Sequence, residues 1–205
     1  MIRSVSLLAL TALLAACAAL TGPRREYAVY TLNPPAAAIR APAPVSDWLL
    51  AIDAPHALGL LDSDRLVVAP DANERLAFAG MRWNERAPVL LQDVWLRAFE
   101  ADGRLAGAIR HPAGSRATVV LASDLLAFQI EHGGAQAQAV VAVQVRLVES
   151  ASRRVLAHAR FSAREDVHGS DARAAVTALE AATGALTTQL VEWVVDRSLR
   201  DGAAP

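Results

Sequence analysis

Lysine is absent from this chain of 205 residues, so all 20 of its basic side chains are arginine. A Schiff-base lysine and a phosphate-loop lysine are therefore excluded, and two classes of enzyme with them. Cysteine occurs once, as Cys17, so no disulfide can form within the chain. Aromatic residues make up only 5% of the sequence, which leaves small aliphatic side chains to build most of the core.

Neither sign of charge is in excess, because 21 acidic side chains balance the arginines to a formal net charge of −1. A nucleic-acid-binding protein usually carries a clear basic excess. We therefore expect no nucleic-acid partner.

The usual signatures of catalysis and metal binding are also missing. The sequence has no Gly-x-Ser-x-Gly string, no glycine-rich phosphate loop and no His-Glu-x-x-His motif. Its five histidines are scattered singly, at His56, His111, His132, His158 and His168. We expect no catalytic residues, no metal and no cofactor.

What the chain does have is a distinctive N-terminus. Arg3 gives a positive start, residues 5–14 are apolar, and two small alanines precede Cys17. This pattern resembles a bacterial lipobox, which predicts a signal peptide over residues 1–16 and lipid attachment at Cys17. One alternative is an ordinary secretory signal with a chance cysteine. Another is an uncleaved anchor, although the apolar stretch is shorter than the roughly 20 residues that a spanning helix needs.

Composition divides the rest of the chain into three parts. Residues 17–46 are expected to hold the lipidated cysteine, a tether, a first strand at 27–32 and a loop rich in proline and alanine. Residues 47–200 are expected to form one folded domain. The last five residues, 201–205, are expected to be a disordered tail.

Hydrophobic periodicity predicts the elements of that domain. Apolar residues repeat at three and four over 87–100 and again from Asp171 to about 199, which predicts two helices. Short apolar runs predict a strand at 48–52 and a hairpin over 65–78. Alternation predicts two antiparallel strands, over 138–147 and 155–162. Residues 118–131 are a further extended candidate, so three long strands are expected to form a meander. The predicted fold is α+β, with a largely antiparallel sheet and two main helices packed on one face.

Arg82 and Trp83 are the candidates for contact with a partner. They lie between the predicted hairpin and the first predicted helix, where an indole and a planar cation could stack on another protein. The alternative is that Trp83 packs beneath the start of the helix.

A set of short motifs, taken in order, resembles the ABC-type transport auxiliary lipoprotein family. The motifs are Cys17, Tyr30-Thr31-Leu32, Pro55 with Leu58, Arg65-Leu66-Val67, Arg82-Trp83 with Glu85 and Pro88, Leu121 with Leu125 and Phe128, Arg154-Val155-Leu156, Arg160-Phe161, and Val176 with Trp193. The chain departs from the family pattern at Ala69, where tyrosine is usual, and in the short segment after Gly80.

The resemblance implies a non-enzymatic accessory subunit of an MCE-type lipid transport system. Its implied partners are an MCE-domain protein with the associated ABC permease and ATPase, and a homo-oligomer is compatible with their symmetry. Ala18 after the cysteine is similar to lipoproteins of the outer membrane facing the periplasm, whereas aspartate there would favour the inner membrane. Two alternatives stay open: a lipoprotein that assists assembly of another envelope complex, and an envelope hydrolase.

Overall fold

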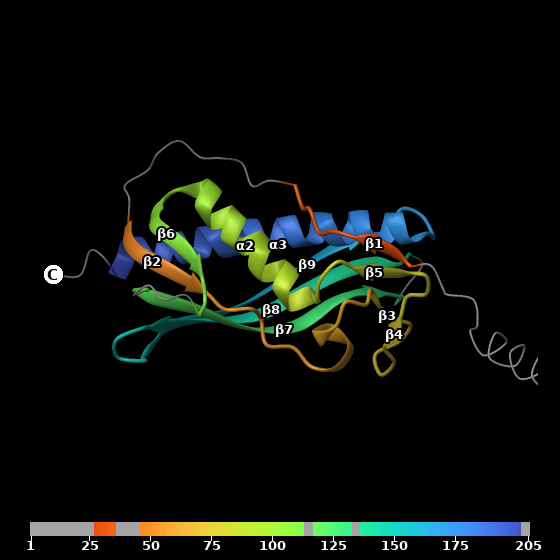
Figure 1. The fold of residues 1–205 in the computed structure, drawn as a ribbon, viewed down its shortest axis with the longest axis horizontal. Coiled ribbons are helices and arrows are strands. Elements are labelled where there is room, and N and C mark those ends of the chain that lie inside the picture. Colours follow the sequence, from red (N-terminus) through yellow and green to blue (C-terminus); the bar gives the residue numbers. More distant parts are fainter. Residues whose placement is uncertain (1–26, 36–45, 113–116, 133–135, 202–205) are drawn as a thin grey trace, which may run out of the picture.

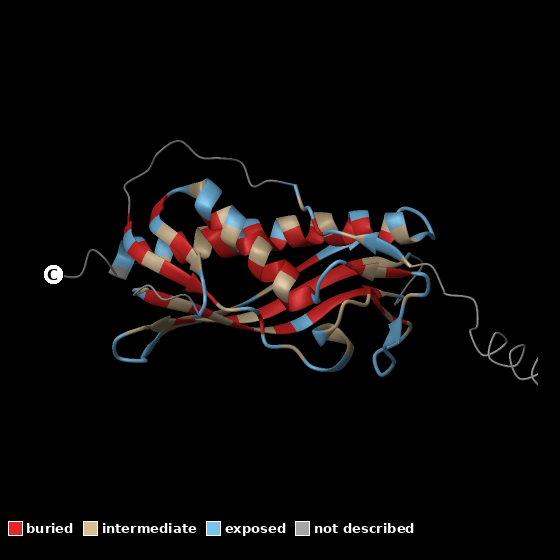
Figure 2. Ribbon diagram, in the orientation of Figure 1, coloured by how far each residue is buried: buried red, intermediate tan, exposed pale blue. Residues whose placement is uncertain are grey.

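Two helices lie on one face of a curled sheet. The computed structural model describes residues 27–35, 46–112, 117–132 and 136–201. Helix α2 (Ala87–Asp102) crosses above the sheet, and the longer α3 (Ala172–Asp201) runs along the body (Figure 1). The buried side chains gather between the helices and the sheet (Figure 2). The expected α+β fold with two main helices on one face is therefore confirmed.

The strands form a large sheet of seven and a small one of two. Their bounds are β1 Ala28–Tyr30, β2 Ser46–Ile52, β3 Val67–Ala69, β4 Leu76–Ala77, β5 Met81–Trp83, β6 Leu105–Arg110, β7 Val119–Glu131, β8 Gln138–Glu149 and β9 Val155–Asp166. A short 3₁₀ helix, η1 (Gly59–Asp62), follows β2.

The three long strands form the predicted antiparallel meander. β8 lies between β7 and β9, with Val143 opposite Leu125 on one side and Phe161 on the other. Every second residue of β8 faces the helices, and these residues are almost completely buried: Ala139, Val141, Val143, Val145 and Leu147. The alternation in the sequence thus separates the residues of β8 that face the helices from those on the opposite face. On that opposite face, Val140 and Ala142 form a small buried cluster with Ala127.

The expectation of a largely antiparallel sheet is wrong, because the sheet is mixed. Among the described residues, four of the seven strand pairings are parallel: β1 with β5, β2 with β6, β2 with β7, and β3 with β7. β2 and β6 are separated in the chain by η1, β3, β4, β5 and α2, and such a long connection, which ends in a helix, allows the two strands to run in the same direction. Periodicity reports which face of a strand is buried and says nothing of the direction of its distant neighbours.

Both helices begin and end where the sequence predicts. Pro88 lies in the first turn of α2, and Gly103 ends the helix with φ 70° and donates its N–H to the Phe99 carbonyl. Asp171 caps α3 by accepting a hydrogen bond of 2.8 Å from the N–H of Ala174. Neither helix of the described chain combines the length and the hydropathy that a membrane span requires.

The sequence did not predict two of the strands, β5 and β6. β5 is only three residues long, and β6 contains Ala106, Gly107 and Ala108, which have low strand propensity. A β-carbon placed on Gly107 would lie 3.2 Å from Cδ1 of Leu49, so glycine allows β6 to pack closely beside β2. The expected hairpin is confirmed as the antiparallel pair of β3 and β4.

Several expected segments lie outside the described residues. These are the signal peptide over 1–16, Cys17 with the tether up to residue 26, most of the loop rich in proline and alanine, and all but the first residue of the expected tail. The boundaries assigned to them stay predictions.

A buried ion pair fastens α3 to the end of α2. The Arg104 guanidinium donates to Asp102 at 2.6 Å and to Glu192 of α3 at 2.9 Å. The side chains of Arg104 and Asp102 are only 9% and 8% exposed. Hydrogen bonds from the guanidinium to Asp102 and Glu192 raise the pKa of Arg104 above its usual value despite its burial. The arginine therefore stays charged near neutral pH.

Replacing Arg104 with alanine should destabilise the fold by about 3 kcal/mol, because Asp102 would remain buried without a counter-ion. Urea unfolding followed by tryptophan fluorescence measures this loss. Arg97→Ala is the matched control, since Arg97 pairs with Asp93 on the exposed face of α2 and should cost less than about 1 kcal/mol. Equal losses in the two variants would contradict the structural role of Arg104.

Candidate functional site

The predicted lipid attachment site, Cys17, lies outside the described residues, and its modification stays a prediction. The described chain begins at Tyr27, ten positions later. The candidate site lies at the first described residues, Tyr27 and β1.

Three side chains meet at that point, and we call them the tether-end cluster: Tyr27, Arg65 and Arg82. The guanidinium carbon of Arg82 lies 4.5 Å from the centre of the Tyr27 ring, and that of Arg65 lies 5.3 Å from it. Both distances are within the range of cation–π attraction. Asp64 pairs with this cluster, at 3.5 Å from Arg82.

Backbone pairing explains how the cluster forms. β1 pairs in parallel with β5, and the N–H of Ala28 donates to the Gly80 carbonyl just before β5. The N–H of Trp83 donates to the Asp64 carbonyl, which places Arg65 beside β5. Because strand residues alternate, Met81 and Trp83 point into the core and Arg82 points outward.

The two predicted partner-contact residues therefore lie in different places. Trp83 is 1% exposed, and its ring lies 5.6 Å from that of Phe128 in the core. Arg82 is 40% exposed, and its contact with a partner stays a prediction. Tyr27 and Arg65 were missed, because 38 positions separate Tyr27 from Arg65 and no local spacing links them.

A groove lies on the helix side, where the chain after β1 crosses α3. The N–H of Asn33 donates to Glu180 at 2.9 Å, and a β-carbon placed on Gly184 would lie 3.3 Å from Cδ of Pro35. The groove has a volume of about 230 Å³. Its lining residues are Asn33, Pro34, Pro35, Val94, Arg97, Ala98, Ala101, Gly184 and Thr187.

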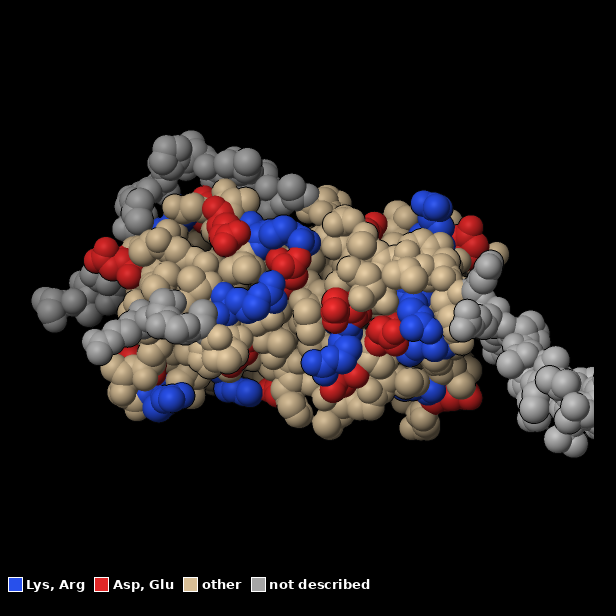
Figure 3. Space-filling view, in the orientation of Figure 1, with Lys and Arg blue, Asp and Glu red and all other residues tan. Residues whose placement is uncertain are grey.

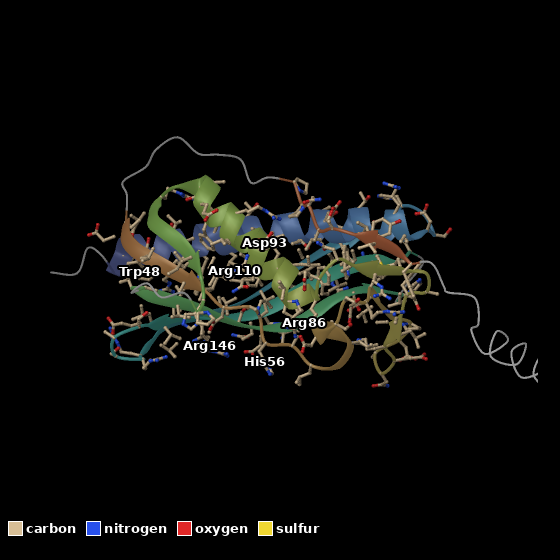
Figure 4. The ribbon with its side chains drawn as sticks, in the orientation of Figure 1. Trp48, His56, Arg86, Asp93, Arg110 and Arg146 are labelled. Atoms are coloured by element: carbon tan, nitrogen blue, oxygen red, sulfur yellow. The ribbon has the colours of Figure 1, made fainter. Side chains whose placement is uncertain are left out.

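Polar pairs lie elsewhere on the surface. His111 contacts Asp53 at 2.6 Å, and Arg146 donates to Asp124 at 2.8 Å, with His56 on the other side of that carboxylate at 3.7 Å. Figure 4 shows His56 and Arg146 at the sheet side and Arg110 and Asp93 at the helix side. Within the described ranges, neither of these histidine rings bonds a serine or threonine hydroxyl, and no group of three potential metal ligands occurs.

The visible face carries both signs of charge in alternation (Figure 3). Glu131 is an example of a surface carboxylate that is paired with an arginine. Burial alone would raise the pKa of Glu131, but hydrogen bonds from Gln129 and Arg164 outweigh it and hold the pKa below its usual value. The carboxylate therefore stays ionised near neutral pH, paired to Arg164 at 2.8 Å.

The described residues form an α+β body in which two helices lie on a curled, mixed sheet. The family model described as "ABC-type transport auxiliary lipoprotein component" matches residues 30–191. The chain belongs to this family of lipoproteins, which confirms the resemblance read from the ordered motifs.

Solved structures share the fold. Protein XCC0632 from Xanthomonas campestris, assigned to the DUF330 family model, is 27% identical, with a TM-score of 0.78 over 86% of this chain and 99% of that one. A second, uncharacterized protein is 11% identical, with a TM-score of 0.63 over 82% of this chain and 99% of its own, and shares the fold alone.

A relative by sequence is longer than this chain. The uncharacterized protein bll6063 of Bradyrhizobium diazoefficiens is 26% identical over 146 residues, which are 71% of this chain. The match spans 39% of that relative's length.

Replacing Gly184 with leucine should displace Pro34 and Pro35 from α3 and destabilise the fold by about 1–3 kcal/mol, as overpacking does. Urea unfolding measures the change. Ala185→Leu is the control, because Ala185 is the next residue of α3 and is exposed. If both leucine variants unfold at the same urea concentration as the parent chain, the close packing of Pro35 on Gly184 is refuted.

Proposed function

We propose that this protein is the anchored docking subunit of an MCE-type ABC lipid transport system. The observation that carries the proposal is the family match over residues 30–191, since the family resemblance implies MCE-domain, permease and ATPase partners. The subunit acts without chemistry of its own. It holds a folded domain at one end of the transport path.

The proposal includes the address of the protein. Cys17 carries the lipid, and Ala18 directs the lipoprotein to the outer membrane, where it faces the periplasm. A diacylglycerol together with an N-terminal acyl chain holds a protein firmly, whereas a single chain is marginal.

The partners in this proposal include a second copy of the chain. Support comes from β9, which in the described part of the sheet pairs only with β8 along its 12 residues. An open strand edge is a ready template for pairing with another chain. The symmetry of the MCE partners is compatible with a ring.

The anchoring part is tested by Cys17→Ala, which should move the protein from the membrane fraction to the periplasmic extract with its fold intact. Circular dichroism of the released protein checks the fold, and Ala19→Ser is a control next to the lipidation motif. If Cys17→Ala stays in the membrane fraction after a high-salt wash, which removes proteins held by charge alone, lipid attachment at this cysteine is refuted.

The partner is tested by crosslinking in intact envelopes with a tagged copy of the full chain. We expect crosslinks to an MCE-domain protein and to a second copy of the chain. Recovery of another envelope assembly without any MCE protein would contradict the transport role and favour a role in assembly.

A further inference from the structure

The tether-end cluster brings two positively charged side chains together with one acidic neighbour, Asp64. Their guanidinium carbons lie no more than about 10 Å apart, because both sit over the Tyr27 ring. At this separation their positive potentials overlap, since the Debye length at physiological ionic strength is about 8 Å. Asp64 neutralises one of them in part, at 3.5 Å from Arg82, and both carry exposed surface.

Both guanidinium groups also have hydrogen-bond donors to spare. Within the described chain, the Nε–H groups of Arg65 and Arg82 are buried without an acceptor, and no ion pair of Arg65 is found there. The buried Nε–H groups are out of reach of an outside ligand, so a phosphate is met by the terminal amino groups of these part-exposed side chains, and the Arg82 guanidinium is shared with Asp64. Arginine binds phosphate in preference to lysine because its donors are planar.

The position of the cluster points to the source of that phosphate. Residues 33–35 run along α3 from Glu180 to Gly184, so the chain before them leads toward the N-terminal end of the helix. β1, which Tyr27 directly precedes, lies toward one end of the body's long axis (Figure 1). At 3.3–3.6 Å per residue, the ten residues from Cys17 to Tyr27 span at most about 35 Å.

The opposite end of the body is beyond that reach. α3 has 30 residues, and at 1.5 Å each it is about 45 Å long. A lipid on Cys17 would therefore hold the end with Arg65 and Arg82 toward the membrane.

We propose that Arg65 and Arg82 bind the phosphate groups of anionic phospholipids in the membrane that holds the anchor. The Tyr27 ring contacts both guanidinium groups, and its own amphipathic character suits the headgroup layer. The contact sets the orientation of the domain, which a flexible tether alone would leave free. It rests on the proposed attachment at Cys17 for its position, while the binding itself needs no lipid anchor.

The test uses the mature chain with Cys17→Ala, so that binding reports the domain and not the anchor. Its flotation is measured with vesicles of phosphatidylcholine and with vesicles that contain 30% phosphatidylglycerol. We expect binding only to the anionic vesicles and loss of binding at high salt. Arg65→Gln and Arg82→Gln should each weaken binding about fivefold, and the double variant about 25-fold.

Arg160→Gln is the matched control, because Arg160 is exposed on β9 and its loss changes the net charge equally. It should bind the vesicles as the parent does, and circular dichroism verifies that all variants are folded. Equal binding to both vesicle types, or equal weakening by Arg160→Gln, would overturn the proposal. So would a double variant that binds vesicles normally but loses its envelope crosslinks, which would assign the arginines to a protein partner. Loss of vesicle binding with crosslinks retained supports the headgroup site and leaves the docking function standing.

Discussion

The packing of α3 against the inner face of β8 is the contact on which the rest of the structure depends. Leu179, Leu186 and Leu190 on the helix are fully buried, and so is Val143 on the strand. Each leucine contributes about 1.5–3 kcal/mol by leaving water. The edge of the layer is closed by Phe161 of β9 and Trp193, whose rings lie 5.7 Å apart. Because aromatic residues are few, the fit of small aliphatic side chains carries most of this layer.

The candidate functional features are attached to this layer rather than part of it. Asn33 is held to α3 through Glu180, and Pro35 rests on Gly184, so the chain that leads from the tether lies along the helix. Just before this segment, the short β1 pairs with β5, and this pairing places Tyr27 next to Arg65 and Arg82. The helix α3 thus fixes the course of the chain over residues 33–35.

Local patterns predicted the elements that are stabilised locally. The alternation of β8 and the three-and-four spacing of α2 each report a buried face, and both were confirmed. The parallel pairings of β2, and the whole of β6, depend on partners far away in the chain, which no short window records. The candidate site shows the same division. Arg82 and Trp83 were predicted together because they are adjacent in the sequence, yet Trp83 lies in the core. The side chains that lie close to Arg82 in space are Tyr27, and across its ring Arg65, and both are distant from Arg82 in the sequence.

Native-state hydrogen exchange tests the central role of the contact between α3 and β8 most directly. If this layer holds the body together, the amides of Leu186 and Leu190 in α3 and of Val143 in β8 should open only with global unfolding. Their opening free energies should then equal one another and the stability obtained from urea unfolding. Exchange of the α3 amides at a free energy several kcal/mol below that of Val143 would show that the helix separates from an intact sheet, and would contradict the account.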